Sequence, residues 1–228
     1  MSDYGLRIKN TSGKIQIDST YRNYVLEKSG SLDLGGGSLT SISITNNPNP
    51  PVVLIRPTDA TNKACGVFDI TYSSPNYTAV RFFGGGVFDV STETSASGTC
   101  TFDYKIFTLS ESKSTEDYGL RIYNTSEKLV YDSGYTPLKI LEVGNATYGS
   151  TYTHASHTNP YYIASPKHSG AFSRLAGGTQ SIFRFSLALA KQSSTSVRGE
   201  WVILGATGTG HGGVYAYSGL NFTLLVCE

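Results

Sequence analysis

The sequence Asp3-Tyr4-Gly5-Leu6-Arg7-Ile8 opens a block that closes with Asp18-Ser19 and occurs twice in the chain. The second copy begins with Asp117-Tyr118-Gly119-Leu120-Arg121-Ile122 and closes with Asp132-Ser133, 114 residues further on. From position 3 to position 21, 13 of the 19 residues are identical in the two copies. Because each repeat unit has about the most common domain length, the repeat predicts two domains of one kind.

Each copy of the block has the pattern of a β-hairpin. Leu6 and Ile8 lie at alternate positions, as in a strand with one buried face. The turn-forming residues 10–13 interrupt the alternation, which then resumes. The second copy has Glu127 where the first has Gly13. Either this position is left-handed and strains Glu127 by about 1 kcal/mol, or the two turns differ in type.

The Asp-Ser pair that closes each block has two interpretations. A carboxylate and a hydroxyl at a strand end usually bond to their own backbone and shape the turn that follows. A catalytic acid or metal ligand would need other acids or histidines nearby, and no second carboxylate or histidine recurs at a fixed spacing close to Asp18 and Asp132 in the sequence. We therefore interpret both pairs as turn-forming scaffold.

The rest of the chain consists of short strand-like runs separated by turn formers, with no convincing helix pattern. The Asn/Pro-rich residues 46–51 cannot join a sheet ladder, and the apolar run that follows is typical of a central strand. Several short strands at regular spacing indicate a sandwich or barrel. The predicted fold is all-β, with two tandem, duplicated antiparallel β-sandwich or barrel-like domains at residues 1–111 and 117–228. The polar residues 112–116 are predicted to be the linker between them.

The composition argues against several classes of function. Charged residues make up 15% of the chain and the net charge is +1, whereas a nucleic-acid-binding protein needs a basic patch. No apolar run approaches the roughly 20 residues that span a bilayer. The first residues enter a strand pattern directly, so we expect no membrane insertion and no cleaved secretion signal. The three cysteines have no metal-like spacing, which favours reduced thiols. Low net charge permits self-association.

Candidate chemistry is sparse. His154 and His157, with His168 or His211, could supply metal ligands, but they lack nearby cysteine and have no counterpart in the first half. The glycine-rich residues 205–213 lead into a strand rather than a helix, unlike a phosphate-binding loop. A carboxylate pair for sugar hydrolysis remains an alternative, because its two members need to be close in space rather than in the sequence. We predict no catalytic residues, no metal and no cofactor.

The segment 144–166 is rich in tyrosine beside small polar residues, a composition that suits adaptable contacts with protein or glycan. The alternative is that these rings pack between strands. Since loop tips are more often functional than strands, we expect contact surfaces in the loops at residues 148–168 and 205–213. The candidate contact residues are Tyr148, Tyr152, His154, His157, Tyr161, Tyr162, His168 and His211.

The repeated block also carries a resemblance. Its Tyr-Gly-Leu-Arg-Ile-x-Asn opening, short turn and closing Asp-Ser-x-Tyr resemble the start of small tail-associated virion proteins of tailed bacteriophages. The resemblance covers residues 4–21 and 118–135 and brings no catalytic residues with it. It implies a protein made in the host cytoplasm and located in the virion tail. Its implied partners are other tail proteins and further copies of itself.

The resulting hypothesis is a non-enzymatic structural component of a phage tail, at the tip or baseplate, which contributes to host attachment. The first domain would anchor the protein, and the second would expose its loops to a host-surface glycan or protein. One alternative is a lectin-like carbohydrate-binding protein or a capsid decoration protein. A glycan-degrading enzyme is a further alternative.

Overall fold

The computed structural model describes residues 7–9, 15–18, 22–35, 38–59, 62–89, 94–154, 156–165, 169–176, 179–206 and 221–228. Within these ranges all regular structure is β, which confirms the predicted class. None of the described residues forms a helix that could span a membrane. In chain order the strands are β1 (Arg7–Lys9), β2 (Ile15–Asp18), β3 (Tyr24–Gly35), β4 (Leu39–Asn47), β5 (Val52–Pro57), β6 (Lys63–Ser73), β7 (Asn76–Gly86), β8 (Phe88–Asp89), β9 (Thr94–Ser95), β10 (Thr99–Leu109), β11 (Arg121–Tyr123), β12 (Leu129–Asp132), β13 (Ile140–Thr147), β14 (Thr151–Thr153), β15 (Tyr161–Ser165), β16 (Ser169–Ala176), β17 (Thr179–Ser193), β18 (Ser196–Ala206) and β19 (Asn221–Cys227).

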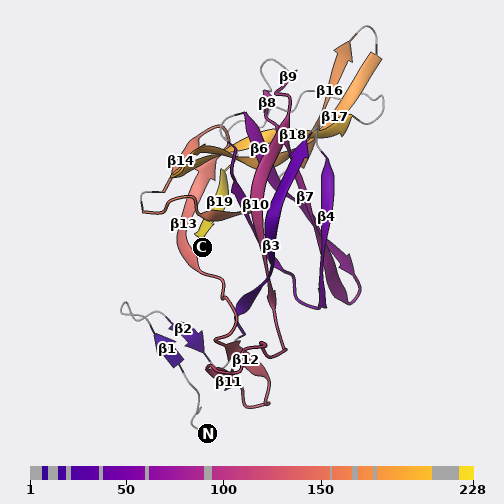
Figure 1. Cartoon of the computed structure of the whole chain (residues 1–228). Helices are drawn as coiled ribbons and strands as arrows, with labels where there is room; N and C mark the ends of the chain where they lie inside the picture. The colour runs from indigo at the N-terminus through magenta and orange to yellow at the C-terminus, as the bar shows by residue number, and fades with distance from the viewer. Residues whose placement is uncertain are drawn as a thin grey trace.

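Two large antiparallel sheets form a β-sandwich (Figure 1). One sheet has the strand order β13-β19-β15-β5-β10-β3, and the other has the order β14-β18-β17-β6-β7-β4 with β16 paired to β17. The main core contains side chains from both sheets, including Phe82 of β7 and Phe102 of β10, whose ring centroids lie 5.9 Å apart. Cys65, Cys100 and Cys227 are all buried as free thiols.

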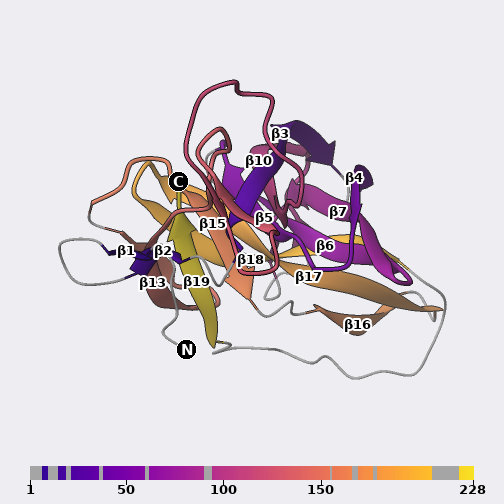
Figure 2. The same cartoon turned by 90° about the horizontal axis from the view of Figure 1, so that it is seen from below.

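The two halves of the chain form one sandwich rather than the two tandem sandwiches predicted. Figure 2 shows β15 beside β5 and β17 beside β6, each pair joining the two halves. The pairs meet at Tyr162 opposite Ile55 and at Leu189 opposite Cys65. The physical reason lies in β5, a largely buried strand that needs a hydrogen-bonded neighbour on each side. One neighbour is β10 of the first half, and the other is β15 of the second.

The strand order of each sheet is mirrored about the line where the halves meet. From edge to centre, the first half contributes β3, β10 and β5 to one sheet, and the second half contributes β13, β19 and β15. In the other sheet, β4, β7 and β6 face β14, β18 and β17. This order is compatible with the predicted duplication of the halves, which itself stays a prediction.

The repeated blocks form two hairpins outside the large sheets, β1–β2 and β11–β12, at the lower end of Figure 1. Arg7 pairs with Asp18 in the first, and Arg121 pairs with Asp132 in the second. Both hairpins have a register shift one residue further along the first strand. The hairpin prediction is therefore confirmed for both copies. Glu127 has a φ of 59°, so the strained left-handed alternative holds for the second turn.

Candidate functional site

The predicted contact residues are mostly covered by the fold. His154 is fully buried, and its Nε2 lies 2.6 Å from the hydroxyl of Tyr162. Tyr161 and Tyr162 are also buried, because β15 lies inside the six-stranded sheet between β19 and β5. The prediction of surface contacts is therefore wrong for these three residues. His154 is therefore not exposed to solvent, as a histidine in a polar loop usually is. Burial lowers its pKa.

The other predicted contact residues have mixed positions. Tyr148, Tyr152 and His157 are half-buried. Tyr152 donates a hydrogen bond to the carboxylate of Glu142, and burial together with this bond raises the pKa of Tyr152 to about 12. His168, His211 and residues 207–213 lie outside the described residues. The part of the chain that the structure describes contains no cluster of three or more His, Cys, Asp or Glu side chains that could hold a metal ion.

Tyr161 packs on the outer face of the six-stranded sheet with Leu54 and Phe107. Two cations cover its ring: the guanidinium carbon of Arg56 and Nζ of Lys105 each lie 4.5 Å from the ring centroid. Contacts of this kind hold the ring in place. The structure thus brings Tyr162 and His154 together in the interior, whereas Tyr161 packs on the opposite face of its sheet.

A second region, the hairpin unit, comprises residues 112–137 and contains the second copy of the repeated block. Ile122, Leu129 and Val130 are its buried apolar side chains. Three backbone hydrogen bonds join the unit and the residue after it to residues 23–26 of the first half: Asn23 N to Val130 O, Leu26 N to Thr136 O and Leu138 N to Tyr24 O. The hairpin unit is therefore a small attached layer at one end of the sandwich (Figure 1).

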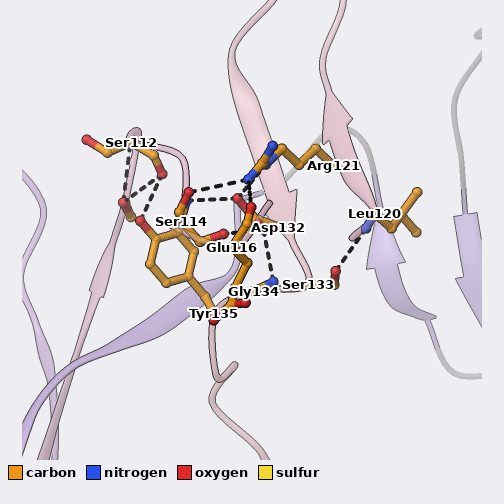
Figure 3. A network of polar contacts seen from close by, with 10 residues as sticks. Ser112, Ser114, Glu116, Leu120, Arg121, Asp132, Ser133, Gly134 and Tyr135 are labelled. Carbon is orange, nitrogen blue, oxygen red and sulfur yellow. Dashed lines mark hydrogen bonds and ion pairs between the residues drawn. The ribbon is translucent and has the colours of Figure 1, made fainter. Parts of the chain in front are cut away.

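Asp132 is the centre of the hairpin unit (Figure 3). Its carboxylate accepts hydrogen bonds from Ser114 N at 2.9 Å and Ser114 Oγ at 3.0 Å. It also accepts from Gly134 N at 2.9 Å and Arg121 Nε at 3.0 Å. Burial alone would raise the pKa of Asp132, but these hydrogen bonds outweigh it and hold the pKa well below its usual range.

The turn-forming interpretation of the second Asp-Ser pair is confirmed. Asp132 binds the amide of Gly134 two residues on, and Ser133 Oγ accepts a hydrogen bond from Leu120 N at 2.9 Å. The same contacts correct the linker prediction for residues 112–116. Ser114 is bonded to Asp132, the carbonyl of Glu116 accepts from Arg121, and the carbonyl of Ser112 accepts from the Tyr135 hydroxyl. The segment therefore belongs to the hairpin unit, because it supplies hydrogen-bond partners to Asp132 and Arg121.

The repeated residues of the hairpin unit are partly uncovered. Tyr118 is 93% exposed and Leu120 is 47% exposed. Tyr123, at the end of β11, is exposed as well. Tyr118, Leu120 and Tyr123 lie within six consecutive positions of the chain, and clustered exposed apolar residues are typical of interaction sites.

A cleft of about 570 Å³ lies between the hairpin unit and the sandwich. Its walls come from the start of β3, the end of β4 with the loop that follows, the end of β10, and the turn at Tyr135. The lining residues are Arg22, Val25, Leu26, Glu27, Thr45, Asn46, Asn47, Pro48, Asn49, Thr108, Leu109, Ser110, Glu111, Ser112 and Tyr135.

Several hydrogen bonds hold the cleft in shape. Asn47 Nδ2 donates to the carbonyl of Leu109 at 2.8 Å, and Asn47 Oδ1 accepts from Asn49 N at 2.9 Å. Arg22 Nη1 lies 2.5 Å from Glu111 Oε1. Glu27 Oε1 accepts from Thr45 N at 2.5 Å, while its Oε2 is buried and has no donor among the described residues. Glu27 therefore lines the cleft with a carboxylate that is only partly hydrogen-bonded by the described residues.

Sequence reasoning missed this cleft. Its lining comes from segments that are far apart in the chain, and only the Asn/Pro-rich residues 46–51 gave a local signal, which we interpreted as a rigid loop. Comparisons of the chain with models of protein families, with curated protein sequences and with solved structures give no match.

Proposed function

We propose that the protein is a structural component of a bacteriophage tail, at the tip or baseplate, and that it contributes to host attachment without acting as an enzyme. The exposure of Tyr118 and Leu120 is the observation that carries this proposal. These two residues belong to the block that resembles tail-associated proteins, yet the rest of this chain leaves much of each residue uncovered. A contact with another tail protein gives them a role.

The proposal assigns the anchoring role to the hairpin unit rather than to the whole first half. Since strands of both halves share both sheets, the two halves cannot act as separate anchor and reader domains. The hairpin unit lies at one end of the molecule, which leaves the far end of the sandwich for other contacts (Figure 1).

The location is tested on purified tailed particles. Labelled antibodies against this protein are applied to particles from a producing lysate and viewed by electron microscopy. We expect label at the tail tip or baseplate. Particles that lack the protein, as judged by mass spectrometry of the purified virions, would refute the proposal. Label on the capsid would instead support the capsid decoration alternative.

The anchoring role is tested with a Tyr118→Ser, Leu120→Ser double variant, supplied during phage growth in place of the wild type. We expect the variant to fold normally, by its thermal melting curve, and to be missing from purified tails. The matched control is Tyr72→Ser, Leu39→Ser, since Tyr72 is 56% exposed and Leu39 43% exposed outside the repeated block. Equal incorporation of both double variants would show that the hairpin unit is not the anchor.

A further inference from the structure

Two of the three cysteines lie together in the core of the sandwich. Cys65 belongs to β6 in one sheet, and Cys100 belongs to β10 in the other. Both residues are fully buried and share the main core cluster, whereas Cys227 packs in a separate cluster with Leu54 and Phe107. The pair therefore lies between the two layers of the fold.

The two sheets come close together at this pair. Cα atoms of β6 and β10 approach within 8 Å of each other, although sheets that pack face to face are usually about 10 Å apart. Gly84 of β7 is the cross-strand partner of Cys65. A Cβ atom placed on Gly84 would lie 3.4 Å from Cβ of Cys100 and 3.2 Å from the carbonyl oxygen of Leu34. Because Gly84 has no side chain, β7 and the neighbouring β6 can approach β10.

The thiols of Cys65 and Cys100 interact with each other. Burial raises the pKa of Cys65 well above its ordinary value, and a hydrogen bond with the Cys100 side chain raises it further. Two thiols that are already in contact need only a small rearrangement of their side chains to reach the bonding distance of about 2 Å. The backbone positions and the side-chain contact thus both suit a covalent bond between the two sulfur atoms.

Metal binding does not account for the pair. A structural metal site built on cysteine takes four ligands as a rule. In the part of the chain that the structure describes, no group of three or more His, Cys, Asp or Glu side chains could hold a metal ion. The chemistry that Cys65 and Cys100 can carry out by themselves is oxidation to a disulfide.

We propose that Cys65 and Cys100 form an oxidative crosslink, a disulfide that joins the two sheets of the sandwich. The oxidant is a small disulfide such as oxidised glutathione. One protein thiolate attacks it and releases one glutathione thiolate, and the second protein thiolate attacks the resulting mixed disulfide and releases the other. The two cysteines lose two electrons and two protons, and the oxidant becomes two molecules of reduced glutathione.

The closed sandwich protects the pair from the oxidant. Neither Cys65 nor Cys100 has exposed surface, and a thiol with a raised pKa supplies little of the reactive thiolate. The crosslink therefore forms while the chain folds or when the sandwich opens. Reducing compartments keep thiols free, so the bond forms only where they are absent. This chemistry goes beyond the proposed tail role and does not depend on it.

The experiment identifies the crosslink by mass spectrometry. The full reduced chain is unfolded in urea and refolded in a buffer of oxidised and reduced glutathione. Its proteolytic peptides are then mapped without reductant. We expect the main linked peptide to join Cys65 with Cys100. Chains that carry glutathione on both of these cysteines instead, or that link either of them to Cys227, would overturn the proposal.

Thermal unfolding shows whether the crosslink fits the native sandwich. Closing the chain between residues 65 and 100 restricts the unfolded state, so we expect the crosslinked protein to melt about 5–10 °C above the reduced protein. Dithiothreitol should remove the difference. A crosslinked chain that melts no higher than the reduced protein, or that does not refold, would also overturn the proposal.

Two variants separate this pair from the third cysteine. Cys227→Ala keeps the pair and should show the same link and the same rise in melting temperature. Cys100→Ala removes one partner and should show neither. If a variant fails to fold, the peptide map of the wild type still decides which cysteines are joined. An equal rise in melting temperature in folded Cys100→Ala would show that the oxidant acts elsewhere, and the proposal would fail.

Discussion

The hairpin unit contains Asp132, and the cleft next to it is lined by Glu27; both residues have a buried carboxylate oxygen. The two carboxylates differ in how many hydrogen bonds they accept from the rest of the chain. Asp132 accepts hydrogen bonds from Ser114, Gly134 and Arg121. Glu27 accepts one, from Thr45, and its second oxygen has no described donor. A carboxylate whose acceptor positions are filled by its own chain is a structural element. One that is half filled contributes less to holding its own region of the fold together.

The largest expected effect is that of Asp132→Ala. The Asp132 side chain is only 2% exposed, and its carboxylate accepts four hydrogen bonds that Ala cannot accept. We expect the free energy of unfolding, measured by urea denaturation at pH 7, to fall by about 2–3 kcal/mol. Glu27→Ala is the comparison variant and should lose less than about 1 kcal/mol, because it removes one hydrogen bond and one unsatisfied oxygen. Equal losses would abolish the distinction between the two regions.

Acidification should destabilise the protein through Asp132. Its pKa is lower in the folded state than the value near 4 of an unfolded aspartate. The stabilisation is therefore present above that unfolded value and is lost as the pH falls towards the folded pKa. Urea unfolding at pH 7 and pH 3 should show a larger drop for the wild type than for Asp132→Asn. A drop of the same size in both proteins would mean that other carboxylates dominate acid unfolding.

Ser114→Ala should have a smaller effect. It removes the hydroxyl that donates to Asp132 Oδ1 but leaves the Ser114 amide, which donates to Oδ2. We expect a loss of about 1 kcal/mol, and less than this in the Asp132→Ala background, since the two residues share one interaction. Thermal or urea unfolding of the two single variants and the double variant gives the coupling. Additive losses would show that Ser114 acts elsewhere.

Glu127→Gly should have the smallest effect, and it should stabilise. Glu127 has a φ of 59°, a conformation that costs a non-glycine residue about 1 kcal/mol or more. Part of the gain is offset by the greater freedom of glycine in the unfolded chain, so we expect up to about 1 kcal/mol. Lys128→Gly, at the next position of the same turn, is the control and should destabilise. A loss of stability in Glu127→Gly would contradict the strain.

Local features of the fold could be predicted from the sequence, whereas the relation between the halves could not. The alternation in the repeated block predicts both hairpins, and the chemistry of Asp132 and Ser133 predicts the turn after β12. A repeat shows that two halves are alike, but it does not show whether they pack separately. The pairing of β5 with β15 joins residues more than 100 positions apart, and no local pattern contains it.

The error at Tyr161 and Tyr162 could have been avoided. Residues 161–165 follow a proline, as the run 52–56 does, and we interpreted the earlier run as a central buried strand. The same interpretation applied to the later run would have placed its tyrosines inside the sheet. The abundance of nearby polar residues outweighed that signal. The cleft beside Glu27 could not be predicted from the sequence, because it forms where several distant segments meet.

The mirrored strand order has a consequence for how the sandwich holds together. Its two halves meet as two subunits of a dimer would, yet they are carried by one continuous chain. Their association is therefore intramolecular, and its effective concentration is set by the chain rather than by the number of molecules present. Two separate half-chains would come apart on dilution. The single chain keeps its core assembled even when very few copies are available.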